Sequence, residues 1–111
     1  MSKKQNNKDY ALVSVLGTVV YSDVVRYDDK YGDKIMELHN YFIQVCDKYK
    51  DKERKYSFKA TQLGLKKNSP IFEKGDRVKI SGILKVNSYQ NDEGEWINQP
   101  YIHINKIDDA E

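Results

Sequence analysis

Cations and aromatic rings alternate closely in the segment CDKYKDKERKYSFK, residues 46–59. Six basic residues stand there against three acidic ones, and the cations are Lys48, Lys50, Lys52, Arg54, Lys55 and Lys59. Tyr49, Tyr56 and Phe58 lie between them. A single-stranded nucleic acid needs cations along its phosphates and flat rings for its bases, and each stacked base contributes roughly 1–3 kcal/mol. An ordinary charged loop flanked by core aromatics gives the same pattern, so both interpretations stay open.

A second group of cations and rings lies in the segment VVRYDDKYGD, residues 24–33. Arg26 and Tyr27 stand at the end of a strand-like stretch, and Lys30 and Tyr31 follow in a loop. Arginine pairs with phosphate or stacks on a base, and tyrosine stacks. A loop tyrosine is less easily explained as a core residue than a strand tyrosine, so this segment favours a binding role.

Two more rings flank the turn SYQNDEGEW, residues 88–96. The middle of the turn is acidic, so we do not expect its tip to hold phosphate. Tyr89 and Trp96 either present rings to a ligand or form a cross-strand aromatic pair that stiffens a hairpin. The sequence leaves these two interpretations open.

Catalytic and metal chemistry find little support in the sequence. His39 and His103 lie far apart, each in a strand-like stretch. The chain has no phosphate-binding glycine loop, no nucleophile elbow and no spaced set of metal ligands. We therefore expect a protein that is not an enzyme and has no cofactor, no metal and no small-molecule substrate.

The bulk composition suits one soluble domain. The chain has 111 residues, of which 39% are hydrophobic, and a net charge of +2 that does not by itself indicate a nucleic-acid partner. Cys46 is the single cysteine, so no intrachain disulfide forms. No apolar run approaches the roughly 20 residues that cross a bilayer, and the N-terminal residues lack the apolar core of a signal peptide. We expect a cytoplasmic protein without a membrane partner.

The elements that must position these residues are mainly strands. Residues 10–25 are rich in β-branched side chains, with Val13, Val15 and Val19 on one face, and Gly17 within them predicts a bulge. Residues 26–34 are typical of a loop, residues 35–40 of a helix start, residues 41–45 of a strand and residues 50–55 of a solvated connection. Residues 56–65 resume a strand.

The second half of the chain predicts a hairpin preceded by a short helix. Ser69 is a suitable cap and Pro70 suits the first turn of a helix within residues 66–76. Residues 77–86 and 96–107 alternate as two strands, and Pro100 limits the second to an edge or to a bulge near its start. This order predicts an all-β, five-stranded OB-fold barrel, with a long hairpin between the fourth and fifth strands and at most one short helix between the third and fourth. Residues 1–9 form a flexible tail, 10–108 the domain and 109–111 a short end.

From about residue 11 to residue 108 the chain resembles the bacterial and phage single-stranded DNA-binding proteins of the OB-fold type. The likeness rests on VSVLGTV, on DVVRYDDKYGD as the exit of the first strand, and most on FEKGDRVKISGILKVNSYQNDEGEW. That last stretch is similar to the family's turn, fourth strand and hairpin with an acidic, glycine-bearing tip. YIHINKID is similar to its final strand.

The resemblance implies that single strands lie over one barrel face and along the long loops, held by stacking and lysines. It implicates Arg26, Tyr27 and Tyr49, together with Lys59 in the third strand. The register there decides the ligand face, since a slip of one residue exchanges the two sides of a strand. If Phe58 and Ala60 point inward, the third strand offers no ring, and the residues that face DNA are Ser57, Lys59 and Thr61.

The resemblance also implies a role for the long hairpin, because the corresponding arm of the family lies against nucleic acid or a neighbouring subunit. Cellular members usually carry a long tail with an acidic-hydrophobic tip, whereas this chain stops at IDDAE. That difference suggests a tailless version from a phage, plasmid or other mobile element.

The sequence thus predicts a protein that binds single-stranded DNA with little sequence preference and protects displaced strands during replication or recombination. RNA is a weaker alternative. The rival interpretation is an OB-type protein-interaction or accessory replication module with weak or no DNA binding. Exposed strand edges lead us to expect a homo-oligomer.

Overall fold

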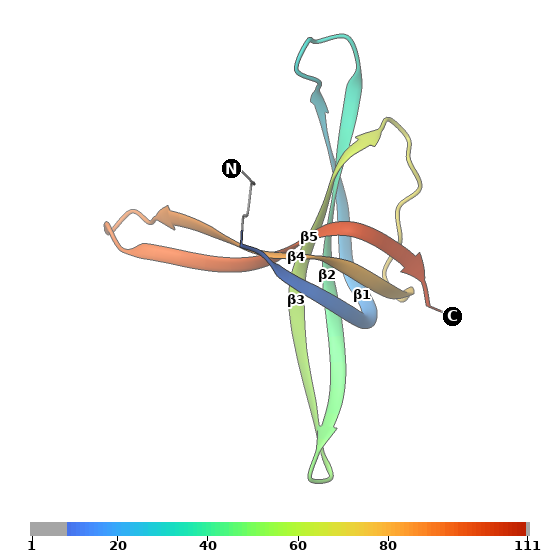
Figure 1. Ribbon diagram of the computed structural model, residues 1–111, viewed down its shortest axis with the longest axis vertical. Coiled ribbons are helices and arrows are strands. Elements are labelled where there is room, and N and C mark those ends of the chain that lie inside the picture. Colours follow the sequence, from blue (N-terminus) through green and yellow to red (C-terminus); the bar gives the residue numbers. More distant parts are fainter. Residues whose placement is uncertain (1–8, 111) are drawn as a thin grey trace, which may run out of the picture.

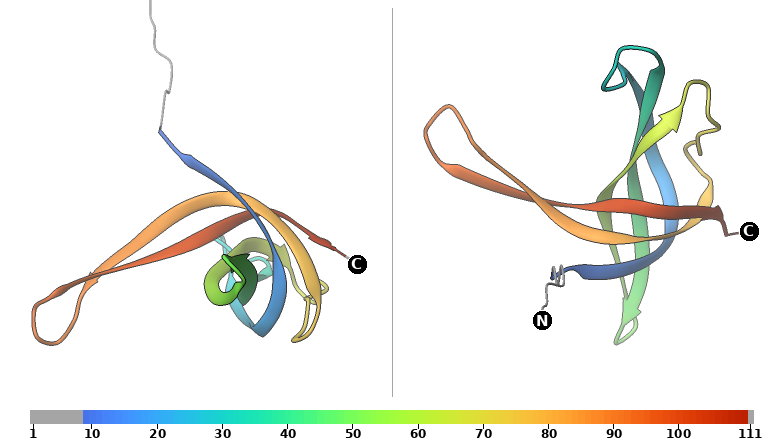
Figure 2. Two further views of the ribbon diagram at one scale, coloured as in Figure 1. Left: turned by 90° about the horizontal axis from the view of Figure 1, so that it is seen from below. Right: turned by 45° about the horizontal axis from the view of Figure 1, so that its top comes forward.

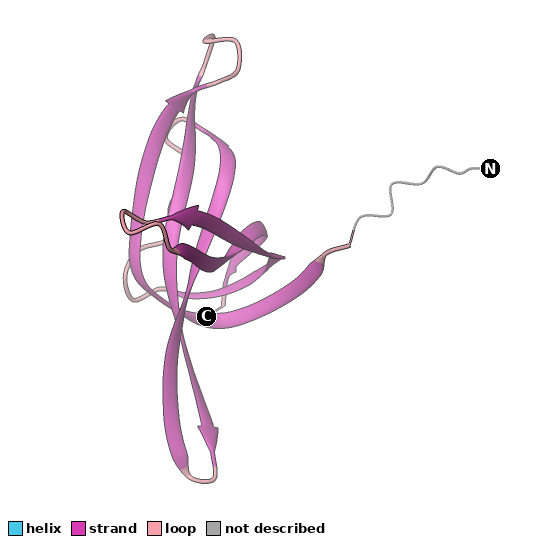
Figure 3. Cartoon of the chain, turned by 90° about the vertical axis from the view of Figure 1, so that its left-hand side faces the viewer, coloured by secondary structure: helices cyan, strands magenta, loops and turns pink. Residues whose placement is uncertain are grey.

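The computed structural model describes residues 9–110, and within that range the chain forms strands and loops without a helix (Figures 1 and 3). The strands are β1 (Ala11–Asp28), β2 (Ile35–Tyr49), β3 (Lys52–Lys66), β4 (Arg77–Gln90) and β5 (Trp96–Asp109). They close into a barrel in the order β1-β2-β3-β5-β4. Only the β3–β5 pairing is parallel. The predicted five-stranded OB-fold barrel is confirmed. Residues 1–8 of the predicted tail and residue 111 lie outside the described range.

The core is the inward side of all five strands. Strand alternation sends every second side chain into the barrel. The buried hydrophobic residues are Val15, Val19, Tyr41, Ile43, Ala60, Val78, Ile80, Ile102 and Ile104. Phe58 packs against them from β3, so the register of that strand is the one in which Phe58 and Ala60 point inward. Strand β3 therefore shows no ring on its solvent side at this level.

Glycine permits two close approaches of backbone that closing the barrel requires. A β-carbon at Gly17 would lie 2.5 Å from the carbonyl oxygen of Gln44, and one at Gly82 would collide with the carbonyl of His103. The bulge that we expected at Gly17 lies instead at Val20, which has no partner between the Val19–Ile43 and Tyr21–Phe42 pairs. Gly17 thus serves close packing, and Val20 changes the register.

Three hairpins extend beyond the barrel as arms (Figure 1). The β1–β2 arm points up, the β2–β3 arm down and the β4–β5 arm to the left in that view, and Figure 2 shows the last of these curving away from the others. The strands are longer than the sequence indicated, because residues 26–28, 35–40 and 52–55 are also paired. The expected solvated connection at residues 50–55 is therefore wrong: Lys50 and Asp51 alone make the turn, with φ of 50° and 65°.

The segment between β3 and β4 is irregular where Ser69 and Pro70 suggested a short helix (Figure 3). Its apolar residues Ile71 and Phe72 pack against the core, and the N–H of Phe72 donates to the Tyr41 hydroxyl at 3.3 Å. Gly75 donates to the carbonyl of Val19 at 2.8 Å. The segment is held extended over the barrel by these contacts, which a helix would break.

A buried ionic network ties the β1–β2 arm to the loop after β3. The side chain of Glu37 is buried, and one carboxylate oxygen accepts from Arg26 Nε at 3.1 Å and from the N–H of Asn68 at 2.8 Å. The other oxygen lies 2.9 Å from Nε2 of His39, which is also buried. The hydrogen bonds from His39 and Asn68 and the charge of Arg26 lower the pKa of Glu37 from 4.5 to about 2, against the opposing effect of burial. The network therefore depends on an ionised Glu37.

We expect this network to make the stability of the folded protein depend on pH. A lowered pKa in the folded state stabilises the fold above the ordinary pKa of 4.5, and the stabilisation is lost as pH falls toward 2. The urea concentration at the midpoint of unfolding of the native protein should therefore fall steeply as the pH is lowered from 4.5 to 2. Glu37→Gln should be less stable at pH 7 and should lose most of that pH dependence.

The matched control is Glu53→Gln, which removes an exposed carboxylate from β3. This variant should keep the native pH dependence when unfolding is followed by circular dichroism. Parallel pH curves for Glu37→Gln and the native protein would contradict the assignment.

Candidate nucleic-acid interface

The solvent side of β1, β2 and β3 forms one continuous surface. Residues that stand opposite each other on neighbouring strands share a side of the sheet. Tyr21 stands opposite Phe42, which stands opposite Lys59, and in the next row Asn40 stands opposite Thr61. We call the surface made by Tyr21, Asn40, Phe42, Lys59 and Thr61 the outer face.

The outer face carries an exposed pair of rings. Tyr21 and Phe42 are 51% and 42% exposed, and their ring centroids lie 6.1 Å apart with a tilt of 57°. Lys59 stands next to Phe42 in the register and is exposed. An exposed pair of rings beside a cation offers stacking for bases and neutralisation for a phosphate.

A groove runs between the outer face and the β4–β5 arm. Its volume is about 360 Å³. Leu38, Asn40, Lys59 and Thr61 line it from the barrel, and Asn87, Gln99 and Tyr101 line it from the arm. Thr61 Oγ1 donates to Asn40 Oδ1 at 3.0 Å. The groove thus combines polar groups with apolar surface, and Lys59 is the one charged side chain among its lining residues.

The structure divides the predicted site residues between two sides of the sheet. Lys48 and Lys55 lie on the solvent side with Lys59, because alternation along β2 and β3 places them with Phe42. Tyr27, opposite Met36, lies on the same side of the β1–β2 arm. Tyr89 shares its side of the β4–β5 arm with the Asn87–Gln99 pair that lines the groove.

The remaining strand residues of the predicted set lie on the opposite side. They are Arg26, Tyr49, Arg54, Tyr56 and Trp96. Lys30, Tyr31 and Lys50 lie in turns at the tips of two arms. The cations and rings that are interleaved in the sequence of residues 46–59 are therefore separated by strand alternation into a lysine side and a tyrosine side.

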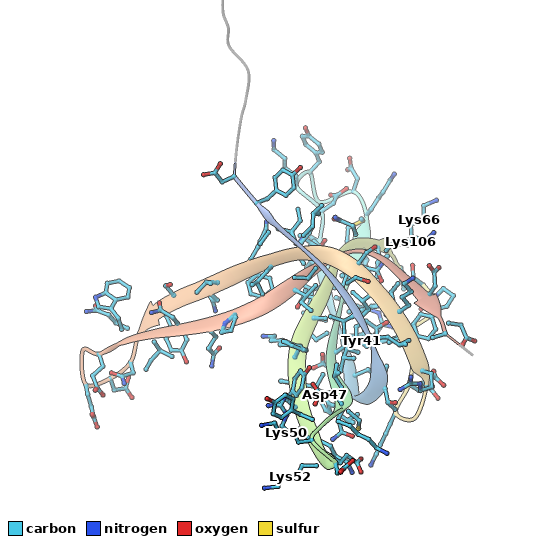
Figure 4. All side chains as sticks on the ribbon, turned by 60° about the horizontal axis from the view of Figure 1, so that its bottom comes forward. Tyr41, Asp47, Lys50, Lys52, Lys66 and Lys106 are labelled. Atoms are coloured by element: carbon cyan, nitrogen blue, oxygen red, sulfur yellow. The ribbon has the colours of Figure 1, made fainter. Side chains whose placement is uncertain are left out.

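Two cations lie close to the tyrosine ring at the tip of the β2–β3 arm. Lys50 Nζ lies 5.4 Å and the Arg54 guanidinium 5.6 Å from the centroid of the Tyr49 ring. The Asp47 carboxylate accepts hydrogen bonds from Arg54 at 3.4 Å and from the Tyr56 hydroxyl at 3.1 Å. The second of these bonds raises the pKa of Tyr56. Figure 4 shows Asp47 and Lys50 at this arm, away from the β4–β5 arm. A base that stacks on Tyr49 would compete with these cations for the ring.

In the β1–β2 arm, the Arg26 side chain forms an ion pair within the fold. Its guanidinium pairs with the buried Glu37 although the side chain remains 55% exposed. At the tip, Lys30 Nζ lies 5.8 Å from the centroid of the Tyr31 ring. Asp29 accepts from the N–H groups of Tyr31 and Asp33 and so shapes the turn. The tip therefore offers an exposed cation and an exposed ring together.

Tyr89 and Trp96 do not form the cross-strand pair that one interpretation of the sequence proposed. Tyr89 stands opposite Ile97, and Gln90 stands opposite Trp96. The two rings therefore point to opposite sides of the arm, and Trp96 is 67% exposed. Each remains available to a ligand on its own side.

Several residues of the interface were not found from the sequence. They are Tyr21, Leu38, Asn40, Phe42, Asn87, Gln99 and Tyr101, whereas Thr61 was expected to face the ligand in the register that the structure has. One signal was present for Phe42, because the inward alternation of Tyr41 and Ile43 turns it to solvent. The groove gave no local signal, since it joins side chains from strands that are distant in the sequence.

No protein-family model and no curated protein matches this chain. Several solved structures, however, are similar to it. The small single-stranded DNA-binding protein of Streptomyces coelicolor has a TM-score of 0.63 at 16% identity, over 93% of this chain and 96% of that one. The mitochondrial single-stranded DNA-binding protein Rim1 of S. cerevisiae has a TM-score of 0.60 at 14% identity, over 94% and 98%. The Plasmodium falciparum single-stranded DNA-binding protein in complex with single-stranded DNA has 0.72 at 16%, over 94% and 96%.

At these identities the comparison establishes the fold. The chain has the OB-type barrel that these single-stranded DNA-binding proteins share. Within residues 9–110 there is no group of three or more side chains suited to hold a metal ion, and no helix that could span a membrane. The outer face and its groove are the part of the described surface where rings, cations and amides meet.

Proposed function

We propose that this protein binds single-stranded DNA across the outer face, with little sequence preference and without catalysis. The exposed Tyr21–Phe42 pair beside Lys59 is the observation that carries the proposal. The fold shared with single-stranded DNA-binding proteins supports it. Rings stack on any base and lysines neutralise any phosphate, so this combination gives affinity without strong sequence preference.

The proposed path of the strand follows the solvent side of β2 and β3. That side is lined toward the β2–β3 arm by Lys48, Lys55 and Lys59. Tyr27 extends it along the β1–β2 arm. Protection of displaced strands during replication or recombination is the role we propose. An origin in a phage, plasmid or other mobile element stays a prediction.

We expect the ring pair to contribute to affinity. Phe42→Ala should weaken binding to a fluorescently labelled oligothymidine by roughly 1–3 kcal/mol, because it removes a stacking surface. Tyr27→Ala should weaken binding in the same direction. Anisotropy titrations at low salt measure both, with a matched duplex as the competitor that should bind poorly.

Tyr10→Ala is the control for these substitutions, since Tyr10 is 68% exposed and precedes β1. The affinity of the Tyr10→Ala variant for the oligothymidine should equal that of the native protein. An equal loss at Tyr10 and Phe42 would refute the assignment of faces. A loss at Tyr49 as large as that at Phe42 would show that DNA also uses the opposite side of the β2–β3 arm. Absence of binding even at low salt would favour a protein partner.

We expect binding to weaken with salt through the three lysines of the solvent side. Each neutralised phosphate of a single strand contributes about 0.7 to the slope of log Kobs against log salt. Replacing Lys48, Lys55 and Lys59 together by Ala should therefore make the slope shallower by about 2. Titrations at a series of salt concentrations measure this slope.

The control removes three lysines that lie outside β1, β2 and β3, namely Lys74, Lys79 and Lys106. This variant has the same net charge as the first one, so it separates local contacts from a general loss of charge. If both triple variants changed the slope equally, the proposed path would be wrong.

We also propose that two copies associate through the free edge of β1. Residues 11–17 pair with β4 on one side, and on the other side they pair with no strand of the described residues 9–110. Leu12 and Leu16 are 70% and 53% exposed on this segment. An apolar groove of about 310 Å³ lies beside it, lined among others by Val13, Val45 and Phe58. An unpaired apolar edge favours pairing with a second chain.

Charges placed on that edge should prevent association. Replacing Leu12 and Leu16 together by Lys should convert a dimer or larger assembly into a monomer, as measured by sedimentation or light scattering. Leu63→Lys, at an exposed leucine of β3, should leave the assembly intact. A native protein that is monomeric at high concentration would rule the interface out.

A further inference from the structure

The groove beside the outer face differs in chemistry from the rest of the proposed interface. Phosphate contacts along β2 and β3 come from lysines, whereas the groove contains one lysine among neutral hydrogen-bonding groups. Those groups are two amides and a tyrosine from the β4–β5 arm, and Asn40 with Thr61 from the barrel. A phosphate offers only acceptors, so it would use the N–H donors of these amides and leave their carbonyl oxygens without a partner.

Two of the amides stand side by side and lack partners within the described chain. Asn87 and Gln99 are opposite each other in the β4–β5 register, so they share one side of the arm, and both are exposed. No hydrogen bond joins either side chain to another part of residues 9–110. By contrast, Asn98 on the other side of the same arm accepts from the Ser88 hydroxyl at 2.7 Å. The groove side of the arm thus keeps its hydrogen-bonding capacity for a ligand.

The barrel side of the groove holds its amide in a fixed orientation. Asn40 Oδ1 accepts from Thr61 Oγ1 at 3.0 Å, which leaves the two N–H donors of Asn40 for a ligand. Leu38 and the Tyr101 ring add apolar surface between the polar groups. Donors, acceptors and apolar surface together match a nucleobase, whose edge carries donors and acceptors and whose faces are apolar.

We propose that this groove binds the edge of a nucleobase and gives the protein a measurable preference among bases. The inference rests on the proposed function and refines it. Stacking on Tyr21 and Phe42 still accepts every base, while the Asn87–Gln99 pair favours the base whose edge it complements. Amide side chains that make two hydrogen bonds to a base edge discriminate against the wrong base by about tenfold or more.

The test compares oligothymidine, oligocytidine and oligoadenosine deoxynucleotides of one length in anisotropy titrations. The native protein should bind the best of them about tenfold more tightly than the poorest. The double substitution of Asn87 and Gln99 by Ala should reduce that spread to within about threefold. Because each oligonucleotide is compared between variants, its own tendency to self-stack cancels.

Asn98→Ala is the matched control, since it removes an amide from the other side of the same arm, and it should keep the native spread. Asn87→Asp with Gln99→Glu keeps both shapes, removes the N–H donors and adds two negative charges, so it should weaken binding of all three oligonucleotides and also change which one is bound best. Thermal melting verifies that each variant is folded.

The outcomes separate the two proposals. Equal and tight binding of all three oligonucleotides by the native protein would overturn the base-edge groove and leave single-strand binding intact. An unchanged spread in the Asn87 and Gln99 double variant would also overturn it. Absence of binding to any of the oligonucleotides would overturn both.

Discussion

The close approach of neighbouring backbones at Gly17 and Gly82 is the constraint on which the barrel depends. A side chain at either position would collide with the carbonyl of Gln44 or of His103. Closure in turn fixes which side of each strand is buried, because side chains alternate along every strand. The solvent side of β1, β2 and β3 is therefore a consequence of how the core closes, and the ring pair of Tyr21 and Phe42 is exposed for that reason.

The strands continue beyond the core, and this gives the molecule its arms (Figure 1). Within an arm the same alternation still holds, so each arm has two chemically different sides. In the β2–β3 arm one side presents Lys48 and Lys55, while the other carries Tyr49, whose ring lies close to two cations. A ligand that follows the barrel surface meets the lysine side first.

Charge and hydrogen bonding have separate tasks in this structure. Glu37 and His39 are buried, the exposed Arg26 pairs with Glu37, and this network links the β1–β2 arm to the loop after β3. The exposed lysines supply attraction for phosphates, and the amides of the groove supply the directional hydrogen bonds that a base edge requires. Arg26 shows the distinction most clearly, because the residue that looked suited to phosphate is paired within the fold.

The sequence by itself determined the five strands, their inward residues and the two regions where cations and rings gather. Alternating valines and isoleucines have a period of two whatever their partners are, so Val15, Val19, Ile43 and Ile104 could be assigned to the core directly. Only the tertiary structure decided which of the gathered residues share a side, because the bulge at Val20 and the register of β3 depend on pairing between distant strands. The groove depends on the same long-range pairing: Asn40 and Thr61 meet Asn87 and Gln99 because β5 joins β3 and carries the β4–β5 arm beside it.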